Sequence, residues 1–71
     1  MLGRQGKVAE SEAAYRAAIA MRPDFAEAHA RLGSVLLRLG RPAEAEAAYA
    51  AAVRLHPDDR RLRSALDTVR R

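Results

Sequence analysis

The segment AESEAAY at residues 9–15 returns 34 residues later as AEAEAAY at residues 43–49. The same spacing relates Pro23 to Pro57. A fixed period of this size is typical of helical repeat proteins, in which each unit buries its apolar face against its neighbours. The period therefore predicts a helical solenoid, a fold that offers an extended surface and rarely holds a reaction centre.

The composition favours an all-α fold within one small domain. The chain has 71 residues, and its hydrophobic fraction of 49% is mostly alanine, the strongest helix former. It contains one Phe and no Trp, and β-branched residues are few, which argues against strands. The absence of Cys excludes disulfides and thiol-based metal sites. No stretch approaches the roughly 18 apolar residues of a membrane span.

The positive charge is concentrated at one end. The formal net charge is +4, and residues 60–71 hold five arginines against Asp67 alone. The excess is therefore a property of the last segment rather than of the whole surface. Arg60, Arg61 and Arg63 stand at a helix start, where the helix dipole disfavours cations. We expect either a solvated end face or, as an alternative, a site for an anion, with nucleic acid the less favoured ligand.

Gly and Pro divide the chain into four predicted helices, at residues 7–21, 25–38, 42–55 and 59–70. The short turns between them predict antiparallel neighbours. Gly6 is expected to end a short leading piece.

The turns carry recognisable capping residues. Asp24 precedes an apolar run and has Glu27 three residues on, which predicts a capping box, and Asp58 is expected to repeat the cap. Gly40 suits a left-handed residue that closes a helix, and Pro42 suits the first turn of the next.

Each predicted helix carries an apolar stripe at helical spacing. We expect the core to draw on Ala14, Tyr15, Ala18, Ile19 and Met21, then Ala28, Leu32, Val35, Leu36 and Leu39, then Ala45, Ala48, Tyr49, Ala52, Val53 and Leu55, then Leu62, Ala65, Leu66 and Val69.

The pattern resembles the tetratricopeptide repeat family. The residues that carry the resemblance are His29-x-x-Leu32-Gly33-x-x-Leu36, Ala45-x-x-x-Tyr49, Ala52 and Pro57, preceded by Ser11-x-x-x-Tyr15, Ala18 and Pro23. The resemblance implies a short right-handed solenoid of antiparallel helix pairs. It divides the chain into a partial repeat at residues 1–23, a full repeat at 24–57 and a C-terminal capping helix at 58–71.

The resemblance also gives the matched residues structural roles. Gly33 and Ala45 would be small where paired helices touch, and Tyr15 and Tyr49 would fill the space between successive helices. His29 and Leu36 both stand where the family has aromatic residues. The packing layer that these two positions form should therefore be thinner.

The two ends of the array differ. In the last helix, charged residues occupy the contact positions of the preceding repeat, as expected of a polar cap: Arg63, Asp67 and Arg70. The N-terminal end starts inside a repeat, which would leave one flank of the 7–21 helix without its usual neighbour. We expect a longer array or self-association, most simply a two-fold dimer involving Leu2, Tyr15 and Ile19.

The resemblance implies a protein–protein interaction module, an adaptor or assembly factor that binds a partner segment on its concave face. The expected contact residues are Glu27, Ala30, Arg31, Ser34, Leu37, Arg38, Arg61, Ser64 and Thr68. Family members that grip a terminal carboxylate use Lys, Asn and Arg, of which only Arg61 has a counterpart here, so such a clamp is not expected. Self-association and anion binding remain the alternatives.

No residue pattern predicts catalysis, a metal or a cofactor. His29 is expected to pack and His56 to lie in a turn. The glutamates at residues 10, 12, 44 and 46 lie two apart on helices, so the members of each pair diverge by about 200°. The N-terminus lacks the apolar core of a secretory signal, and a bacterial-type cytoplasmic protein is expected.

Overall fold

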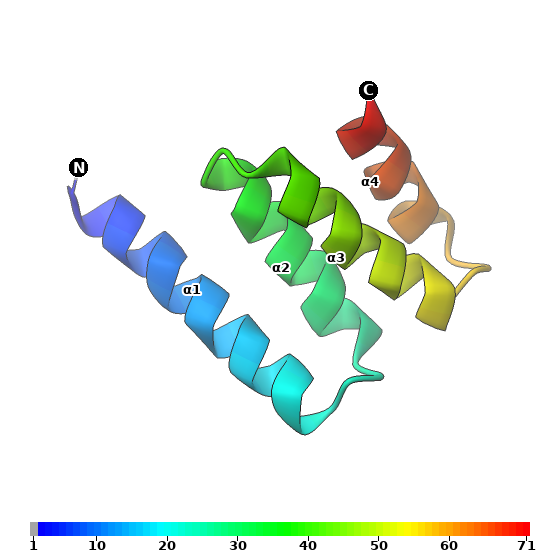
Figure 1. Ribbon diagram of the computed structural model, residues 1–71, viewed down its shortest axis with the longest axis horizontal. Helices are drawn as coiled ribbons and strands as arrows, with labels where there is room; N and C mark the ends of the chain where they lie inside the picture. The colour runs from blue at the N-terminus through cyan, green and yellow to red at the C-terminus, as the bar shows by residue number, and fades with distance from the viewer. Residues whose placement is uncertain (1) are drawn as a thin grey trace.

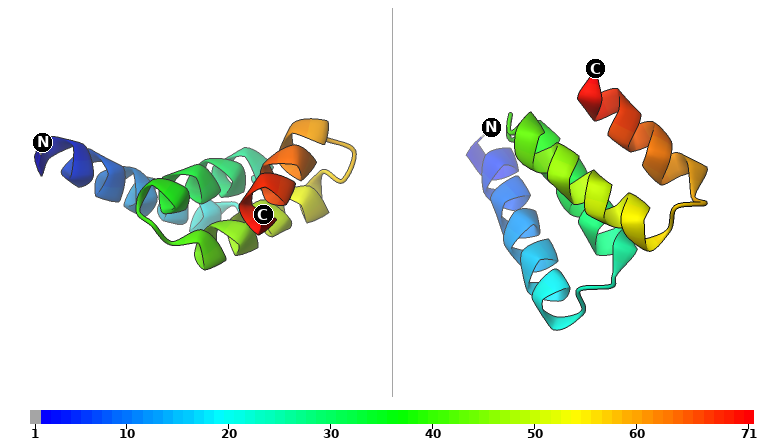
Figure 2. Two further views of the ribbon diagram at one scale, coloured as in Figure 1. Left: turned by 90° about the horizontal axis from the view of Figure 1, so that it is seen from above. Right: turned by 45° about the vertical axis from the view of Figure 1, so that its right-hand side comes forward.

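The computed structural model describes residues 2–71, with side chains from Lys7 onward. Over this range it consists of helices without strands: α1 (Leu2–Met21), α2 (Ala26–Arg38), α3 (Pro42–Leu55) and α4 (Arg60–Arg70) (Figure 1). Consecutive helices run antiparallel. The central α2 packs against both α1 and α3, and α4 packs against α3 (Figure 2). The predicted all-α class and stacked helix pairs are confirmed.

The first helix is longer than predicted. It begins at Leu2 rather than at residue 7, and Gly6 lies inside it. A single Gly costs a helix only about 1 kcal/mol relative to Ala, and no Pro interrupts residues 2–21. Gly6 therefore does not end the helix, although Gly40, at the equivalent position of the next repeat, lies in a turn.

Both predicted aspartate caps are wrong by one residue. The N-cap of α2 is Phe25, which makes no side-chain cap bond, and the Glu27 carboxylate accepts from Arg31 instead of completing a capping box. At α4 the cap is Asp59, whose Oδ1 accepts from the Arg61 N–H at 2.9 Å. Each helix starts one residue later than expected because the Pro-Asp pair belongs to the turn before it.

The turn between α2 and α3 follows its prediction. Gly40 has φ +74°, and its N–H donates to the Leu37 carbonyl at 3.0 Å. The Arg41 N–H donates to the Leu36 carbonyl at 2.9 Å, which completes a Schellman cap. Pro42 then begins α3. This closure aligns α2 and α3 as an antiparallel pair, which has the most extensive helix–helix contact among the described residues.

The core lies between α2 and α3. Leu32, Leu36, Ala45 and Ala48 form a buried cluster, against which half-buried residues of α1 and α4 pack: Tyr15, Ile19 and Val69. Small residues on α3 let the leucines of α2 approach closely, as the sequence predicts.

Two predicted core residues of α1 are not in the core. Ala14 is exposed, and Met21 is 84% exposed. Their counterparts on α3 are Ala48, which is buried against α2, and Leu55, which is 37% exposed. Ala14 is exposed because this flank of α1 has no covering helix among residues 2–71, whereas the position of Met21 is exposed on α3 as well.

Candidate partner-binding groove

A groove of about 410 Å³ separates α2 from α4. Both walls are helical, and the base is formed by α3, which packs against both. The lining residues are Glu27, Ala30, Arg31 and Ser34 from α2, Tyr49 from α3, and Arg61, Leu62 and Ala65 from α4. The groove therefore offers an apolar base and a polar rim.

The base of the groove depends on Gly33. Tyr49 is only 8% exposed, and its ring lies directly against the backbone of Gly33. A Cβ added at Gly33 would lie 2.8 Å from Cδ2 and Cε2 of the ring. The missing side chain thus makes room for Tyr49 between α2 and α3, so the predicted roles of both residues are confirmed.

Arginines dominate the charge around the groove. Arg31 Nη2 lies 2.8 Å from Glu27 Oε2, and this carboxylate, with the Tyr15 hydroxyl as a lesser contributor, raises the pKa of Arg31. The Arg61 side chain is 93% exposed, and its Nε lies 3.7 Å from Asp59 Oδ1. Arg38, one turn beyond Ser34, forms no ion pair among the residues whose side chains are described. The groove therefore carries an excess of positive charge.

The comparison with protein families agrees with this architecture. A family model described as tetratricopeptide repeat matches residues 2–60. The chain belongs to the tetratricopeptide repeat family. Searches of curated proteins and of solved structures found no match. Tetratricopeptide repeats generally mediate protein–protein interaction and are generally not catalytic.

The structure of this tetratricopeptide repeat chain brings together five of the nine predicted contact residues: Glu27, Ala30, Arg31, Ser34 and Arg61. Leu37 and Arg38 are exposed on α2 but do not line the groove. Ser64 lies in a separate hollow beside α3, and the Thr68 hydroxyl donates to the Ser64 carbonyl at 3.0 Å.

Sequence reasoning did not include Tyr49, Leu62 and Ala65 among the contact residues. Their helical spacing in the sequence assigns all three to the core. The signal that points to the α4 pair is its helical spacing from Arg61, because Ala65 lies one turn further on the same side of the helix.

The arginines at the start of α4 do not converge. Arg61 lies on the groove, whereas Arg60 and Arg63 line a hollow between α3 and α4. Arg70, which lines the same hollow, is held by Glu46 at 3.0 Å. The positive charge is therefore divided between two sides of α4, and Glu46 partly balances it on the side of the hollow between α3 and α4.

The residues predicted for self-association lie mainly toward the core. Tyr15 and Ile19 both pack against the central cluster of α2 and α3. The side chain of Leu2, the third predicted residue, lies outside the described residues. The exposed flank of α1 presents Ala14 and Met21 instead.

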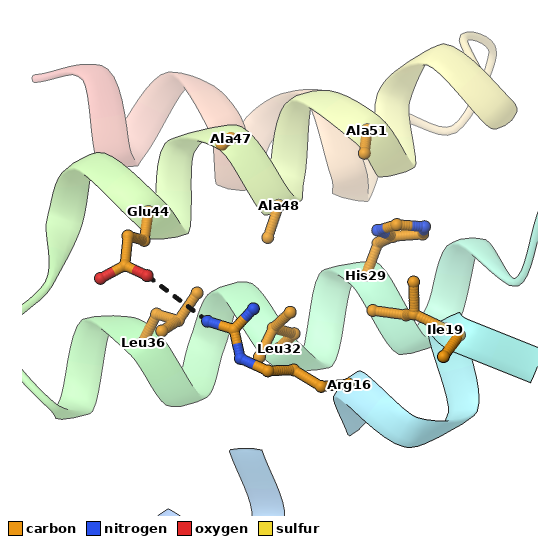
Figure 3. Close-up of a pocket in the computed structure, with 10 residues that line it drawn as sticks. Arg16, Ile19, His29, Leu32, Leu36, Glu44, Ala47, Ala48 and Ala51 are labelled. Atoms are coloured by element: carbon orange, nitrogen blue, oxygen red, sulfur yellow. Dashed lines mark hydrogen bonds and ion pairs between the residues drawn. The ribbon is translucent and has the colours of Figure 1, made fainter. Parts of the chain in front are cut away.

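A second hollow, of about 480 Å³, lies between α1 and α3 above α2 (Figure 3). Its lining is mostly Ala, Leu and Ile, with three polar side chains, Arg16, His29 and Glu44. His29 is half-buried, and its Nε2 lies 2.9 Å from the Pro23 carbonyl oxygen, to which a protonated nitrogen donates. The histidine therefore packs, as expected, and holds the turn before α2.

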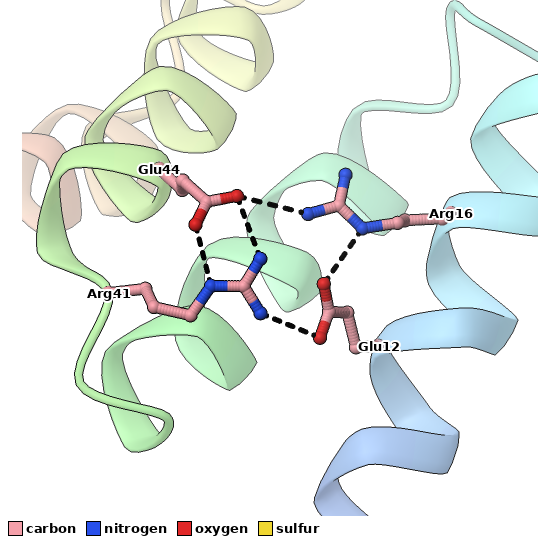
Figure 4. A network of polar contacts seen from close by, with 4 residues as sticks. All are labelled: Glu12, Arg16, Arg41 and Glu44. Carbon is pink, nitrogen blue, oxygen red and sulfur yellow. Dashed lines mark hydrogen bonds and ion pairs between the residues drawn. The ribbon is translucent and has the colours of Figure 1, made fainter.

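A closed ring of alternating charge sits at the edge of this hollow and ties α1 to α3 (Figure 4). Glu12 accepts from Arg16 at 2.9 Å and from Arg41 at 3.0 Å. Arg41 also donates to Glu44 through two bonds, of 2.6 and 2.8 Å, and Arg16 closes the ring to Glu44 at 3.4 Å.

The ring shifts the ionisation of its members. Arg16, with Arg41 second, holds the pKa of Glu12 below its ordinary value. Arg41 does the same for Glu44, and Glu44 in turn raises the pKa of Arg41. Because every charge in the ring is already matched, these groups serve to fix α1 against α3 rather than to perform acid–base chemistry.

Among the described residues, no three His, Cys, Asp or Glu side chains are grouped so that they could hold a metal ion. None of the helices within residues 2–71 combines the length and the apolar character that crossing a membrane requires.

Proposed function

We propose that this tetratricopeptide repeat chain is a non-catalytic protein-interaction module that binds an extended, acidic segment of a partner protein in the α2–α4 groove. The observation that carries the proposal is the groove itself, in which Tyr49 supplies an apolar base between two charged helical walls.

The dimensions suit a short extended segment. The 13 residues of α2 are about 20 Å long, and an extended chain advances about 3.3 Å per residue. About six residues of a partner would therefore span the length of the helix. Side chains on one side of such a segment would reach Tyr49, Leu62 and Ala65, and its other polar groups would meet the rim.

The charge on the rim favours acidic partners. Among the described residues, the charged side chains that line the groove are Arg31, Arg61 and Glu27, and the exposed Arg38 lies on α2 outside it. Because Glu27 already neutralises part of Arg31, the cations most accessible to a partner are Arg38 and Arg61. Carboxylates of a bound segment would form charge-assisted hydrogen bonds with these guanidinium groups.

The test uses a displayed library of random peptides of about ten residues, selected on the purified chain. We expect enriched sequences with net negative charge, and their affinity, measured by fluorescence anisotropy, should fall with added salt. Ser34→Trp fills the groove and should weaken binding by about tenfold or more.

Ser64→Trp is the matched control, because Ser64 is an exposed helical serine that lies outside the groove. It should leave the affinity unchanged. Selected peptides without acidic residues, or equal losses in the two variants, would refute the proposed site. Circular dichroism of both variants verifies that the helices are intact.

A further inference from the structure

The hollow between α1 and α3, here called the α1–α3 hollow, is bounded on three sides by described helices (Figure 3). Its walls are α1 and α3, and its floor is α2. Its volume of about 480 Å³ falls within the range of about 300–1,000 Å³ that is common for ligand sites. The apolar lining consists of Ile19, Ala20, Leu32, Leu36, Ala47, Ala48 and Ala51. Because the apolar lining of α3 is all alanine, no long apolar side chain reaches across from that wall.

The α1–α3 hollow and the α2–α4 groove lie on opposite faces of the α2–α3 pair. On α2 the groove is lined by Glu27, Ala30, Arg31 and Ser34, and the hollow by His29, Leu32 and Leu36. Successive residues of a helix are turned by about 100°, which places these two sets on opposite sides of α2. On α3, Tyr49 lines the groove, whereas Ala47, Ala48 and Ala51 line the hollow. A ligand in the hollow would therefore leave the groove accessible.

The charges at one end of the hollow balance each other. Arg16 and Glu44, which line that end, belong to the ring that Glu12 and Arg41 complete (Figure 4). The ring holds two cations and two carboxylates in mutual contact, so it offers no net charge to a ligand. A charged ligand would lose its hydration in the hollow without gaining a counter-ion. The hollow therefore favours a neutral ligand.

His29 stands at the other end of the hollow (Figure 3). Its Nε2 lies 2.9 Å from the carbonyl oxygen of Pro23, and because a carbonyl only accepts, this nitrogen carries the proton. In the neutral imidazole the other nitrogen, Nδ1, is then an acceptor. No hydrogen bond reaches Nδ1 from the residues whose side chains are described. The hollow thus combines an apolar surface with an acceptor that suits a donor on the ligand.

We propose that the α1–α3 hollow binds the tryptophan side chain of a partner protein. An indole ring is flat and apolar, and it carries a single N–H donor and no acceptor, which matches Nδ1 of His29. A phenylalanine ring would fill the same space but would leave Nδ1 unpaired in an apolar contact, which costs free energy. Tryptophan is also enriched among the few residues on which the affinity of an interface depends.

The chain contains no Trp, so indole fluorescence reports on an added probe alone. The probe is N-acetyltryptophanamide, in which the side chain stands between two neutral peptide groups. We expect saturable binding with a dissociation constant on the order of 1 mM, and a shift of the emission to shorter wavelength as the ring leaves water. The analogue methylated at the indole nitrogen lacks the donor and should bind about fivefold more weakly. N-acetyltyrosinamide, measured by competition, should also bind more weakly.

Variants locate the site. Ala20→Phe places a ring over the hollow and should abolish binding. Ala17→Phe is the matched control and should leave binding unchanged, because Ala17 is an exposed alanine of α1, like Ala20, but does not line the hollow. His29→Phe removes the acceptor and should make the probe and its methylated analogue bind equally. Circular dichroism of the three variants verifies that the helices are intact.

Several results would overturn the proposal: no saturable binding, equal affinity of the parent chain for the probe and its methylated analogue, a difference between these two that persists in His29→Phe, tighter binding of the tyrosine compound, or equal losses in Ala20→Phe and Ala17→Phe. The peptides selected for the α2–α4 groove give an independent readout. They should bind Ala20→Phe with unchanged affinity and should not displace the probe. Displacement would place the probe in the groove and would overturn this proposal while leaving the proposed function intact.

Discussion

The ring of Tyr49 lies so close to Gly33 that a single carbon added at Gly33 would sit 2.8 Å from the ring. Real Cβ atoms do not approach an aromatic carbon so closely, and the ring is buried at the base of the α2–α4 groove. The glycine therefore couples the packing of the helix pair to the shape of the surface on which the proposed partner would lie.

Gly33→Ala should destabilise the chain. Alanine gains about 1 kcal/mol of helix propensity over glycine, but overpacking a buried contact costs about 1–3 kcal/mol. We expect a net loss of about 1 kcal/mol in the free energy of unfolding, measured by urea denaturation. The double variant with Tyr49→Leu should lose less than the two single changes together, because the smaller side chain removes the clash. Additive effects would contradict the clash.

Asp59→Ala should cost about 1 kcal/mol, because it removes the side-chain cap of α4. Asp58→Ala and Asp24→Ala are the controls, and each should change stability by less than about 0.5 kcal/mol, since neither carboxylate caps a helix. Thermal unfolding monitored by circular dichroism gives the comparison. A larger loss of stability for Asp58→Ala than for Asp59→Ala would indicate that Asp58 caps α4, as the sequence predicts.

Gly40→Ala should cost about 1–2 kcal/mol, because φ at this position is +74° and an L side chain there is strained. No heavy atom lies within 4 Å of the added carbon, so the backbone conformation alone accounts for the cost. Gly40→Asn should cost less, since Asn tolerates the left-handed region better than Ala does. Equal losses in urea denaturation would indicate a steric contact instead.

The ring of Glu12, Arg16, Arg41 and Glu44 should make stability depend on acid pH. The pKa values of Glu12 and Glu44 are lowered in the folded state, so their contribution is present above the ordinary glutamate pKa of about 4.3 and is lost as the pH falls through the lowered values. Arg41→Met should lower the urea midpoint at neutral pH, and the difference from the parent chain should shrink below about pH 4.

Arg38→Met is the control for the ring. Arg38 precedes the same turn and forms no ion pair among the residues with described side chains. Its replacement should leave the slope of stability against pH unchanged. The role of the ring would be excluded if Arg41→Met and the parent chain lost stability in parallel on acidification.

The turns mark what the sequence predicts well and where it fails. Gly40 adopts a positive φ without the strain that a side chain would cause, and the ring of Pro42 fixes φ at a helical value, so their roles follow from local chemistry. The cap predicted at Asp58 failed because Asp59 is its neighbour with the same side chain, and only the position of the first helical turn decides between them. The prediction that Gly6 ends a leading piece was wrong, because a helix tolerates a single glycine when nothing else interrupts it.

The rest of the fold and the candidate sites also divide into features that the sequence predicts and features that only the structure shows. The sequence alone determined the helices, their antiparallel order, and the small residues at which α2 and α3 meet, because a period of 34 residues and helical spacing are properties of the chain itself. Only the tertiary structure decided that Ser64 lies outside the groove that Arg61 lines, and that Ala14 is exposed while Ala48 is buried. Identical local patterns acquire different exposure because burial depends on which helix packs alongside.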